Sequence, residues 1–501
     1  MSFFKSKEFA LILFSSFLFA FAFPPSPFSF LGYLALVPLL FLLEGISARK
    51  AFWFCYIFGV ITNVLLLYWI IWQTFYGEYF VLPGSIAAFL ILAVYPAGWG
   101  WLLAHLRLKW NKAVILAPFL WVGMEYLRGM GQIGFPWLDL GYTQTNYLPL
   151  IQFAPLTGIS GVSFWVVTLN VLAYFLLRNF RNRKRALAYA FFIVILLLGP
   201  YLYGERELTS ENKSDGIRVA LIQGNIDPRT KWDPQFLDYN FWVYDSLSRL
   251  AGEAKPDLII WPETACPCYL EKEPEYLSRV ENLAKELNSD LVAGTDDYMI
   301  LGPQQYVFYN SAFWISPDSG LKKKYNKTQL VPFAERIPYS GNMRLFEEIK
   351  LGQANFSPGR ELTLFRTPKG SFATLICYEM AFPDLVRRFV KSGADFLVNI
   401  TNDGWFGRTA GPYQHAAMSI MRAVENRISV ARCANTGISL TVDPYGRVLG
   451  RTRLFETANL IRVVSTKTET TFFTMTGPWL GKLCLAVTLL AGFLILVRKL
   501  F

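Results

Sequence analysis

Long apolar runs fill the first 203 residues of the chain, and one more run lies near its C-terminus. A helix that crosses the hydrocarbon core of a bilayer needs about 20 predominantly apolar residues. The pattern therefore predicts a membrane domain over residues 1–210 with seven transmembrane helices, at residues 8–23, 28–43, 51–72, 81–105, 112–128, 158–177 and 186–203. A C-terminal transmembrane helix is predicted within residues 470–501, at 476–497, which makes about eight spans.

The pattern changes over residues 215–465, where short β-rich runs alternate with charged helical patterns. Strands are predicted at residues 217–223, 257–261, 290–294, 307–315, 372–376, 396–400, 428–432 and 438–442. Helices are predicted near 234–251, 273–288, 382–391 and 412–426. A stretch of this size and alternation is typical of one α/β domain.

The composition supports this division of the chain. The protein is 53% hydrophobic and 17% charged, and its mean hydropathy is +0.31. These values exclude a wholly soluble protein and a disordered one. The 6 Cys residues are spread over 501 positions, which excludes a small domain held together by disulfides.

The net charge of +11 comes from 48 Lys and Arg residues against 37 Asp and Glu residues. Before residue 203 the basic residues gather between the predicted spans, at Lys5, Lys7, Arg49, Lys50, Arg107, Lys109, Lys112, Arg178, Arg181, Arg183, Lys184 and Arg185. Clusters in alternate loops are the product of the positive-inside bias. We therefore interpret the excess charge as membrane topology, with no role in nucleic-acid binding, and expect residues 215–465 outside the cytoplasm.

Candidate chemistry lies at the ends of predicted strands in the α/β domain. One apolar strand ends at Cys377, just before a helical pattern. A thiol at such a turn lies near backbone N–H groups, which favour the thiolate, although a buried core cysteine is the alternative. A second buried strand leads to Glu263, at the sheet edge where α/β sites gather. Farther along, Lys327 and Glu335 flank a short apolar run.

Taken with the residues around them, these segments resemble the nitrilase superfamily, which has a Glu-Lys-Cys triad on an αββα sandwich. The flanking positions that share its pattern are Gln223, Gly224, Asn225, Lys231, Trp232, Asp233, Asn399, Asn402, Asp403, Gly404, Trp405, Gly407, Gly411, Gln414 and His415. With seven predicted spans before this domain and one after it, essentially the whole chain resembles the apolipoprotein N-acyltransferase family. The resemblance implies that residues 215–465 form a nitrilase-like catalytic domain.

The resemblance also implies a role for each matched residue. Glu263 is expected to be the general base, Lys327 to stabilise the oxyanion, and Cys377 to be the nucleophile. Supporting or substrate-binding roles are implied for Glu335, Tyr378, Glu379, Trp232, Asn310 and Trp405. The chemistry of the triad fits independently, because a thioester is readily attacked by an amine and an ammonium stabilises an oxyanion.

The family resemblance implies an N-acyltransferase of lipoprotein maturation. Such an enzyme takes a fatty acyl chain from a phospholipid, holds it as a thioester and passes it to the α-amine of a diacylglyceryl-modified N-terminal cysteine. No metal or other cofactor is implied, and the protein is expected to be a monomer. The expected location is the inner membrane, which the chain crosses several times, with the catalytic domain on the periplasmic side.

Two other functions remain open from the sequence. A membrane-tethered amidase of the nitrilase type would resolve the acyl-enzyme with water, and its spans would serve only as anchors. A transporter or sensor would use the outer domain to bind a ligand, and would not need Cys377. Glu125 and Arg128, three residues apart, are expected to pair on one helical face near the membrane interface, which does not favour an ion path.

Several residues also have a plain structural interpretation. Cys266 and Cys268 depart from the family pattern and their redox state stays open, but two His residues in the whole chain argue against zinc. His415 is expected to make a structural hydrogen bond, and Glu379 either orients the Cys377 turn or supports the site. The remaining alternatives are core positions for Trp232 and Trp405, and a solvated run for Lys322, Lys323 and Lys324.

Overall fold

The computed structural model describes residues 6–76, 81–209, 216–303, 305–339, 355–466 and 469–500. The chain forms two compact units, one made of Met1–Ser210 and Thr476–Phe501 and the other of Glu211–Met475. Lys5, which belongs to the first predicted basic cluster, and residue 215, where the predicted α/β domain begins, lie outside the described residues.

The first unit is helical. Its α-helices are α1 (Ser6–Ala22), α2 (Val37–Leu42), α3 (Ala48–Leu67), α4 (Val81–Leu92), α5 (Val94–Lys109), α6 (Ala117–Arg128), α7 (Leu148–Ile151), α8 (Ala154–Thr157), α9 (Ile159–Arg178), α10 (Arg183–Leu208) and α17 (Trp479–Leu500). Its 3₁₀ helices are η1 (Ser29–Tyr33), η2 (Tyr68–Tyr76), η3 (Asn111–Leu116), η4 (Pro136–Leu138) and η5 (Leu140–Gln144). The most extensive packing joins α3 to α5, α6 to α17 and α9 to α10.

Among the described residues, five helices are long and apolar enough to cross a membrane. They are Ala48–Trp72, Val81–Lys109, Ile159–Arg178, Arg183–Leu208 and Trp479–Val497. The predicted count of about eight spans is therefore not confirmed and stays a prediction. Residues 8–23 and 28–43, predicted as two spans, form the 17-residue α1 and the shorter apolar segment Ser29–Leu42. The prolines between them end the first helix, because proline has no backbone N–H to donate.

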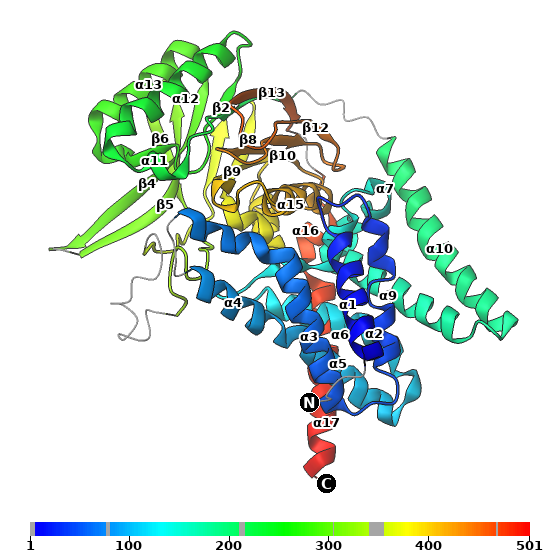
Figure 1. The fold of residues 1–501 in the computed structure, drawn as a ribbon. Coiled ribbons are helices and arrows are strands. Elements are labelled where there is room, and N and C mark those ends of the chain that lie inside the picture. The colour runs from blue at the N-terminus through cyan, green and yellow to red at the C-terminus, as the bar shows by residue number, and fades with distance from the viewer. Residues whose placement is uncertain are drawn as a thin grey trace. The chain divides into compact units, whose positions relative to one another are not determined.

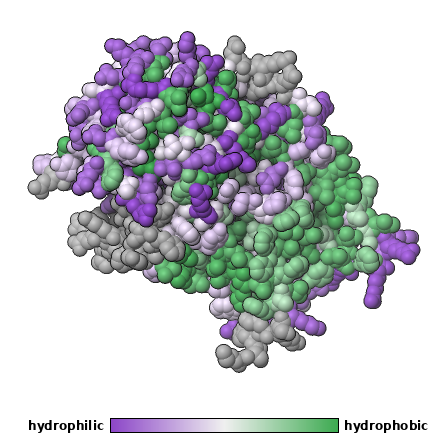
Figure 2. Space-filling view, turned by 45° about the horizontal axis from the view of Figure 1, so that its top comes forward, coloured by the Kyte–Doolittle hydropathy of each residue, from purple (hydrophilic) through white to green (hydrophobic). Residues whose placement is uncertain are grey.

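The helical unit exposes large apolar side chains. The apolar window of α10 has a mean hydropathy of 2.1, yet none of it is buried inside the protein. Side chains that are more than half exposed on α10 and α17 are Leu187, Phe191, Phe192, Val194, Leu202, Leu489, Leu490, Phe493 and Leu496. A broad hydrophobic surface is visible in Figure 2. Water disfavours such a surface and lipid does not, so these helices have the character of a membrane protein.

Glu125 and Arg128 of α6 do not form the pair that their spacing suggested. Arg128 instead pairs with Asp139 at 2.8 Å. The carboxylate of Glu125 accepts hydrogen bonds from Trp121 Nε1 at 2.7 Å and from the backbone N–H of Leu140 at 2.8 Å. The correction has a physical cause: Asp139 and Leu140, in the segment after η4, return to the end of α6 and supply partners for Arg128 and Glu125.

The second unit contains two β-sheets. The first has seven strands, β1 (Gly216–Gln223), β2 (Leu258–Ile260), β3 (Cys266–Tyr269), β4 (Asp290–Gly302), β5 (Gln305–Ser316), β6 (Gly320–Asn326) and β13 (Ala458–Ser465), in the order β13-β1-β2-β4-β5-β6 with β3 paired to β4. The second has six strands, β7 (Leu364–Thr367), β8 (Gly370–Ile376), β9 (Phe396–Thr401), β10 (Ser429–Ala434), β11 (Leu440–Val442) and β12 (Val448–Arg451), in the order β12-β11-β10-β9-β8-β7. Contacts of β1 with β10 and of β5 with β8 join the sheets face to face.

Helices cover the outer faces of both sheets. The main ones are α12 (Leu237–Gly252) and α13 (Pro274–Leu287) on the first sheet, and α14 (Pro383–Lys391) and α15 (Gly411–Asn426) on the second. Figure 1 shows α12 and α13 side by side along their sheet. The shorter helices are α11 (Pro228–Lys231), η6 (Pro234–Phe236), η7 (Leu270–Lys272), η10 (Cys377–Ala381), η11 (Asp403–Phe406) and α16 (Phe472–Thr476). The layers follow the order αββα, which agrees with the predicted nitrilase-like sandwich.

The core between the first sheet and its helices fixes the strand that leads to Glu263. Alternate side chains of the strands and one face of each helix are fully or almost fully buried there, among them Ala220, Ile222, Phe241, Tyr244, Ile259, Trp261, Val280, Leu283, Leu291 and Phe313. Burial of this kind contributes about 25 cal/mol per Å² of apolar surface. Because β2 lies inside this core, the residues that follow it have a defined position.

Every strand predicted from the sequence is present with shifted ends, and β3, β6, β7, β12 and β13 are additional. Of these, β6 contains the three consecutive lysines that were predicted to be a solvated run, and Lys322 and Lys323 are indeed exposed, whereas Lys324 is about one-third exposed. Lys324 pairs with Glu271 and with Asp297, each at 2.8 Å. Lys322 lies 5.1 Å from the ring centre of Trp314. Successive side chains of a strand point to opposite faces, so each lysine finds a different partner.

Candidate active site

The three residues of the predicted triad follow three different strands. Glu263 comes shortly after β2, Lys327 directly after β6, and Cys377 directly after β8. Parallel pairing of β2 with β1 and of β8 with β9 places the carboxyl ends of these strands at one edge of their sheets. Cys377 has a φ of +51°, a left-handed conformation that side chains other than glycine rarely adopt. Such a conformation at the first residue after a strand is typical of a functional turn.

Glu263, Lys327 and Glu335 form a buried charged cluster. The ammonium of Lys327 lies 2.8 Å from Glu335 Oε1 and 3.4 Å from Glu263 Oε1. Asn310 Nδ2 donates to the same two oxygens, at 3.1 Å for Glu335 and 2.8 Å for Glu263. The other oxygen of Glu263 accepts from the backbone N–H of Asn402 at 3.0 Å. Two carboxylates are therefore bridged by one ammonium and one amide.

Burial works against the charge on Lys327, whose side chain is fully buried. The carboxylates of Glu335 and Glu263 outweigh this effect and raise the pKa of Lys327 above its ordinary value. The ammonium is therefore retained at neutral pH. With two carboxylates and one ammonium, the cluster keeps one negative charge that can accept a proton.

Burial is the largest influence on the thiol of Cys377, and the carboxylate of Glu263 adds to it, so the pKa of Cys377 is raised above its usual range although Lys327 opposes the shift. The resting thiol therefore keeps its proton, as the expected role of Glu263 as its general base requires. A protonated cysteine needs a base at the moment of attack, and the charge of Glu263 is close enough to act on it.

Glu379 ties the Cys377 turn to the Lys327 loop. One carboxylate oxygen accepts from the backbone N–H groups of Thr328 and Gln329, at 2.7 and 3.1 Å, and from the hydroxyl of Tyr325 at 2.7 Å. The other oxygen accepts from the backbone N–H of Ile376 at 2.8 Å. Glu379 is fully buried. Every contact holds backbone or hydroxyl groups around the site, so the structure favours an orienting role.

The aromatic residues of the predicted site have different environments. Tyr378 is buried and packs edge-to-face on Phe382 at 5.0 Å. Trp405 lies in η11 and is half-buried. Trp232 ends α11 and is 46% exposed, so it is not a core aromatic. In the described ranges, no hydrogen bond connects Trp232 to Glu263, Lys327 or Cys377.

A second buried network supports the Cys377 turn from behind. His415 Nε2 lies 3.0 Å from the backbone oxygen of Cys377, and His415 Nδ1 lies 2.9 Å from Asp403 Oδ1. Arg432 donates to Asp403 Oδ2 at 2.7 Å. Burial opposes the charge on Asp403, but Arg432 and His415 hold its pKa well below the usual range. The expected structural hydrogen bond of His415 is present, whereas nothing in the sequence pattern pointed to Arg432 as part of this network.

His415 should affect catalysis through the position of Cys377. Because a carbonyl oxygen only accepts, His415 Nε2 must carry the proton of that bond. His415→Leu should lower kcat by up to about 10²-fold with little change in KM, since small displacements of a nucleophile have effects of this size. His415→Gln keeps an N–H donor and should retain most of the activity. Steady-state kinetics of both variants test this positioning role, and equal thermal unfolding of the two variants is the control. Equal activities of the two variants would contradict the role.

Lys231, which the sequence gave no role beyond its place in the matched pattern, also contacts the site. Its ammonium donates to the backbone oxygen of Glu263 at 3.0 Å and to Thr264 Oγ1 at 2.6 Å. Thr264 has a φ of +48°, so these bonds hold a strained turn beside the carboxyl group. Burial lowers the pKa of Lys231 to about 8, although Glu263 and Asp296 favour the charged form. Only the motif that also contains Trp232 pointed to this position.

The depressed pKa of Lys231 predicts a pH dependence of stability. In the unfolded chain Lys231 stays protonated up to a pKa of 10.5, whereas the folded protein releases the proton at about 8. Between these values the unfolded state binds more protons, so the free energy of unfolding should rise with pH, by at most about 3 kcal/mol. Denaturant unfolding of the detergent-solubilised protein from pH 8 to 10.5 measures this. Lys231→Met should abolish this rise, and Lys369→Met should not. If the free energy of unfolding had the same slope against pH in both variants, the rise could not be assigned to Lys231.

No metal centre is evident at this site. Within the ranges given above, no group of three His, Cys, Asp or Glu side chains is placed to hold a metal ion. Cys266 and Cys268 are free, and the first is fully buried.

Comparison with known proteins identifies two matched regions. Residues 15–172 match the family model described as the apolipoprotein N-acyltransferase N-terminal domain, and residues 218–469 match the model described as carbon-nitrogen hydrolase. The chain is 37% identical to an apolipoprotein N-acyltransferase of Geobacter metallireducens, over 98% of this chain and 96% of the relative. It is 33% identical to one of Chlorobaculum tepidum, over 99% and 97% of the two chains. A solved amidase of Nesterenkonia sp. AN1 is 22% identical with a TM-score of 0.40, and the match covers 53% of this chain and 95% of that one.

Proposed function

This chain belongs to the apolipoprotein N-acyltransferase family, and we propose that it transfers a fatty acyl chain from a phospholipid to the α-amine of a diacylglyceryl-modified N-terminal cysteine. Relatives with that name match it over nearly their full length. The observation that carries the proposal is the charged cluster of Glu263, Lys327 and Glu335, in which Glu263 and Lys327 act on the thiol of Cys377. The cluster and the thiol together supply a base, a cation and a nucleophile, the groups that acyl transfer needs.

In the first half-reaction, Glu263 takes the proton of the Cys377 thiol as the sulfur attacks the ester carbonyl of the phospholipid. The tetrahedral intermediate carries an oxyanion, which the ammonium of Lys327 stabilises; one such donor is worth about 3 to 4 kcal/mol. The C–O bond then breaks, and the lysophospholipid leaves with the proton that Glu263 held. The acyl chain remains on Cys377 as a thioester.

In the second half-reaction, the free amine of the lipoprotein attacks the thioester carbonyl. Glu263 accepts a proton from this amine, and Lys327 again faces the oxyanion. The C–S bond breaks, the sulfur regains a proton, and an amide forms. The net change converts one phospholipid and one amine into one lysophospholipid and one amide, so no cofactor is required.

The remaining site residues support this chemistry. Glu335 and Asn310 hold Lys327 and Glu263 through the hydrogen bonds described above. Glu379 fixes the turn of Cys377, and Tyr378 packs directly behind it. Trp232, which is exposed, and Trp405 are assigned to substrate contact. This division follows from exposure: the side chains of Glu263, Lys327 and Glu335 are 9%, 0% and 14% exposed, whereas Trp232 is 46% exposed and available to a ligand.

The helical unit gives the proposed reaction its location. We assign Met1–Ser210 and the C-terminal helix to the membrane domain, with about eight spans, and residues 215–465 to a catalytic domain on the periplasmic side of the inner membrane. The basic clusters between the spans support this orientation. Donor and acceptor are lipids, and removing a chain from the bilayer costs about 0.8 kcal/mol per CH₂ group. A monomer anchored in the bilayer avoids this cost.

An assay with defined substrates tests the proposal. The full-length protein in detergent micelles is mixed with a phospholipid and a peptide that bears a diacylglyceryl N-terminal cysteine. The expected product is the N-acylated peptide, detected by mass spectrometry, together with one lysophospholipid for each amide formed. Free fatty acid without N-acylation, or turnover of soluble amides instead, would contradict acyl transfer and point to an amidase.

A further inference from the structure

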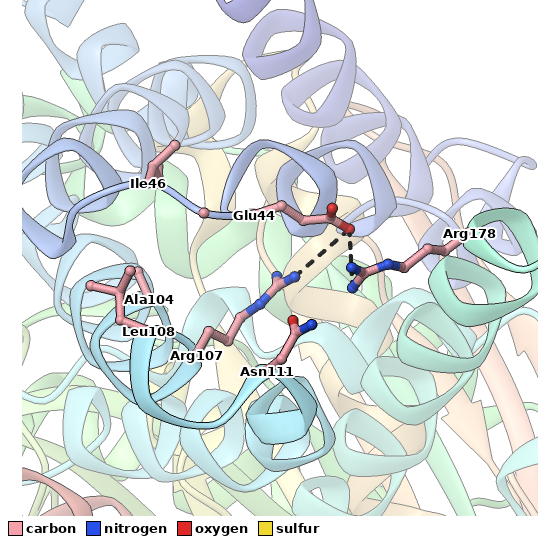
Figure 3. A pocket seen from close by; sticks show the side chains of 8 residues that line it. Glu44, Ile46, Ala104, Arg107, Leu108, Asn111 and Arg178 are labelled. Atoms are coloured by element: carbon pink, nitrogen blue, oxygen red, sulfur yellow. Dashed lines mark ion pairs between the residues drawn. The ribbon is translucent and has the colours of Figure 1, made fainter.

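A charged cavity of about 450 Å³ opens among helix ends of the helical unit. Its walls come from the connection after α2, the end of α5, the start of η3 and the end of α9. The lining residues are Glu44, Gly45, Ile46, Ala104, Arg107, Leu108, Asn111 and Arg178. Figure 3 shows Arg107 and Arg178 approaching Glu44 from opposite sides, with Asn111 between the two arginines. The triad residues belong to the other unit, so this cavity is a separate feature.

One carboxylate in the cavity faces two guanidinium groups. Glu44 Oε1 lies 3.7 Å from Arg107 Nη2 and 3.5 Å from Arg178 Nη1. The hydroxyl of Tyr174 accepts from both arginines, at 2.8 and 2.7 Å, and donates to Glu44. Two positive charges and one negative charge leave the cavity with a net charge of +1.

One buried donor at the cavity lacks an acceptor. The side chain of Arg107 is only 4% exposed, and its Nε is buried without a hydrogen-bond partner. Arg178 is 35% exposed, so its guanidinium group is accessible from outside. A buried donor without a partner costs about 1 to 3 kcal/mol, so native proteins rarely leave one unless a ligand or water completes it.

The surroundings define the ligand. The helix ends near the cavity carry many basic residues, namely Arg49, Lys50, Lys109, Lys112, Arg181, Arg183, Lys184 and Arg185. A basic end of a membrane bundle faces the cytoplasmic leaflet, where basic pockets between helices bind anionic head groups. Guanidinium groups match the geometry of phosphate oxygens, and a phosphodiester carries the single negative charge that the cavity lacks.

We propose that this cavity binds the phosphodiester of an anionic phospholipid head group, with Arg107 and Arg178 as the phosphate ligands and Asn111 at the entrance. The site is distinct from the proposed acyl-donor site, which lies at the triad. Glu44 sets its selectivity, because its charge disfavours head groups with further negative charge. Lipid bound here ties α2, α5 and α9 together at the membrane surface.

Native mass spectrometry of the full-length protein in detergent tests the site. Phosphatidylglycerol and phosphatidylcholine with the same acyl chains are the probes, and the first should be retained in preference. Arg178→Gln should weaken phosphatidylglycerol retention about fivefold, the effect expected for one basic residue. Arg185→Gln removes the same charge from an exposed position outside the cavity and is the matched control. Glu44→Gln removes the competing carboxylate and should strengthen retention.

The signs of these effects separate a binding site from a structural cluster. Stronger retention in Glu44→Gln together with weaker retention in Arg178→Gln supports the proposal. Equal losses in Arg178→Gln and Arg185→Gln would show only diffuse attraction and overturn it. A loss of retention in Glu44→Gln would also overturn it, because a purely structural salt bridge gives that result. If millimolar inorganic phosphate displaced phosphatidylglycerol, the proposal of a lipid ligand would be wrong, and the ligand would be a soluble phosphate.

Discussion

Replacing Cys377 by alanine should reduce acyl transfer by about 10⁴-fold or more, because loss of the nucleophile removes the covalent route and the other groups cannot replace it. The pKa of this thiol is raised by burial and by Glu263, so it is a weak nucleophile until a base removes its proton. The reaction therefore depends on the sulfur and its neighbours together. Rates of N-acylation of a diacylglyceryl peptide, measured with phospholipid in excess, give the effect directly.

A matched cysteine variant controls this measurement. Cys268 is a free and half-buried cysteine in the same unit. Cys268→Ala should keep the wild-type rate, since no site contact involves its thiol. A transporter or sensor that only binds a ligand would tolerate both variants equally. If Cys377→Ala retained its activity, the proposed covalent mechanism would be wrong.

Replacing Lys327 by methionine should lower both activity and stability. The methionine has similar length but no charge, so Glu263 and Glu335 would face each other without the ammonium that now lies 3.4 and 2.8 Å from them. Loss of the oxyanion partner should reduce kcat about 10²- to 10³-fold. Loss of one member of a buried ion cluster should reduce the free energy of unfolding by about 3 to 5 kcal/mol.

The pH dependence of Lys327→Met identifies the cause of its instability. Two unbridged carboxylates raise the pKa of one of them, because like charges disfavour joint ionisation. A carboxyl group whose folded pKa is raised loses stability as the pH rises through that value, so acidification should restore part of the stability of this variant. Lys324→Met is the control, as Lys324 also bridges two carboxylates but is about one-third exposed. A pH-independent loss in Lys327→Met would contradict the bridging role.

The sequence predicted the parts of the site that depend on local pattern. Glu263 and Cys377 each follow an apolar run, and residues after parallel strands meet at a sheet edge in any α/β fold. One α/β domain was predicted in the same way, because most of its central strands are short apolar runs between turns, whereas the αββα sandwich was expected only from the family resemblance. Lys327 was singled out only by its motif. Three lysines in succession interrupt the alternation of apolar and polar residues that would have predicted β6.

Other features depend on contacts between distant segments, which the sequence pattern does not contain. The strand β13 pairs with β1 from more than 200 residues away. Lys231 contacts the backbone oxygen of Glu263, and His415 contacts that of Cys377. Every residue has a backbone oxygen, so residue types do not reveal such contacts. The pKa of Cys377 could not be predicted from the sequence for the same reason, because it is set by burial and by the charge of Glu263.

If Cys377 carries the acyl chain between the two lipids, the thioester should accumulate when no acceptor amine is present. Wild type and Cys377→Ala are incubated with phospholipid in the absence of an acceptor, and their intact masses are measured. Wild type should gain the mass of one fatty acyl group in place of a hydrogen and lose it when the diacylglyceryl peptide is added, whereas Cys377→Ala should gain nothing. An unmodified wild type, or the same adduct on both proteins, would contradict the account.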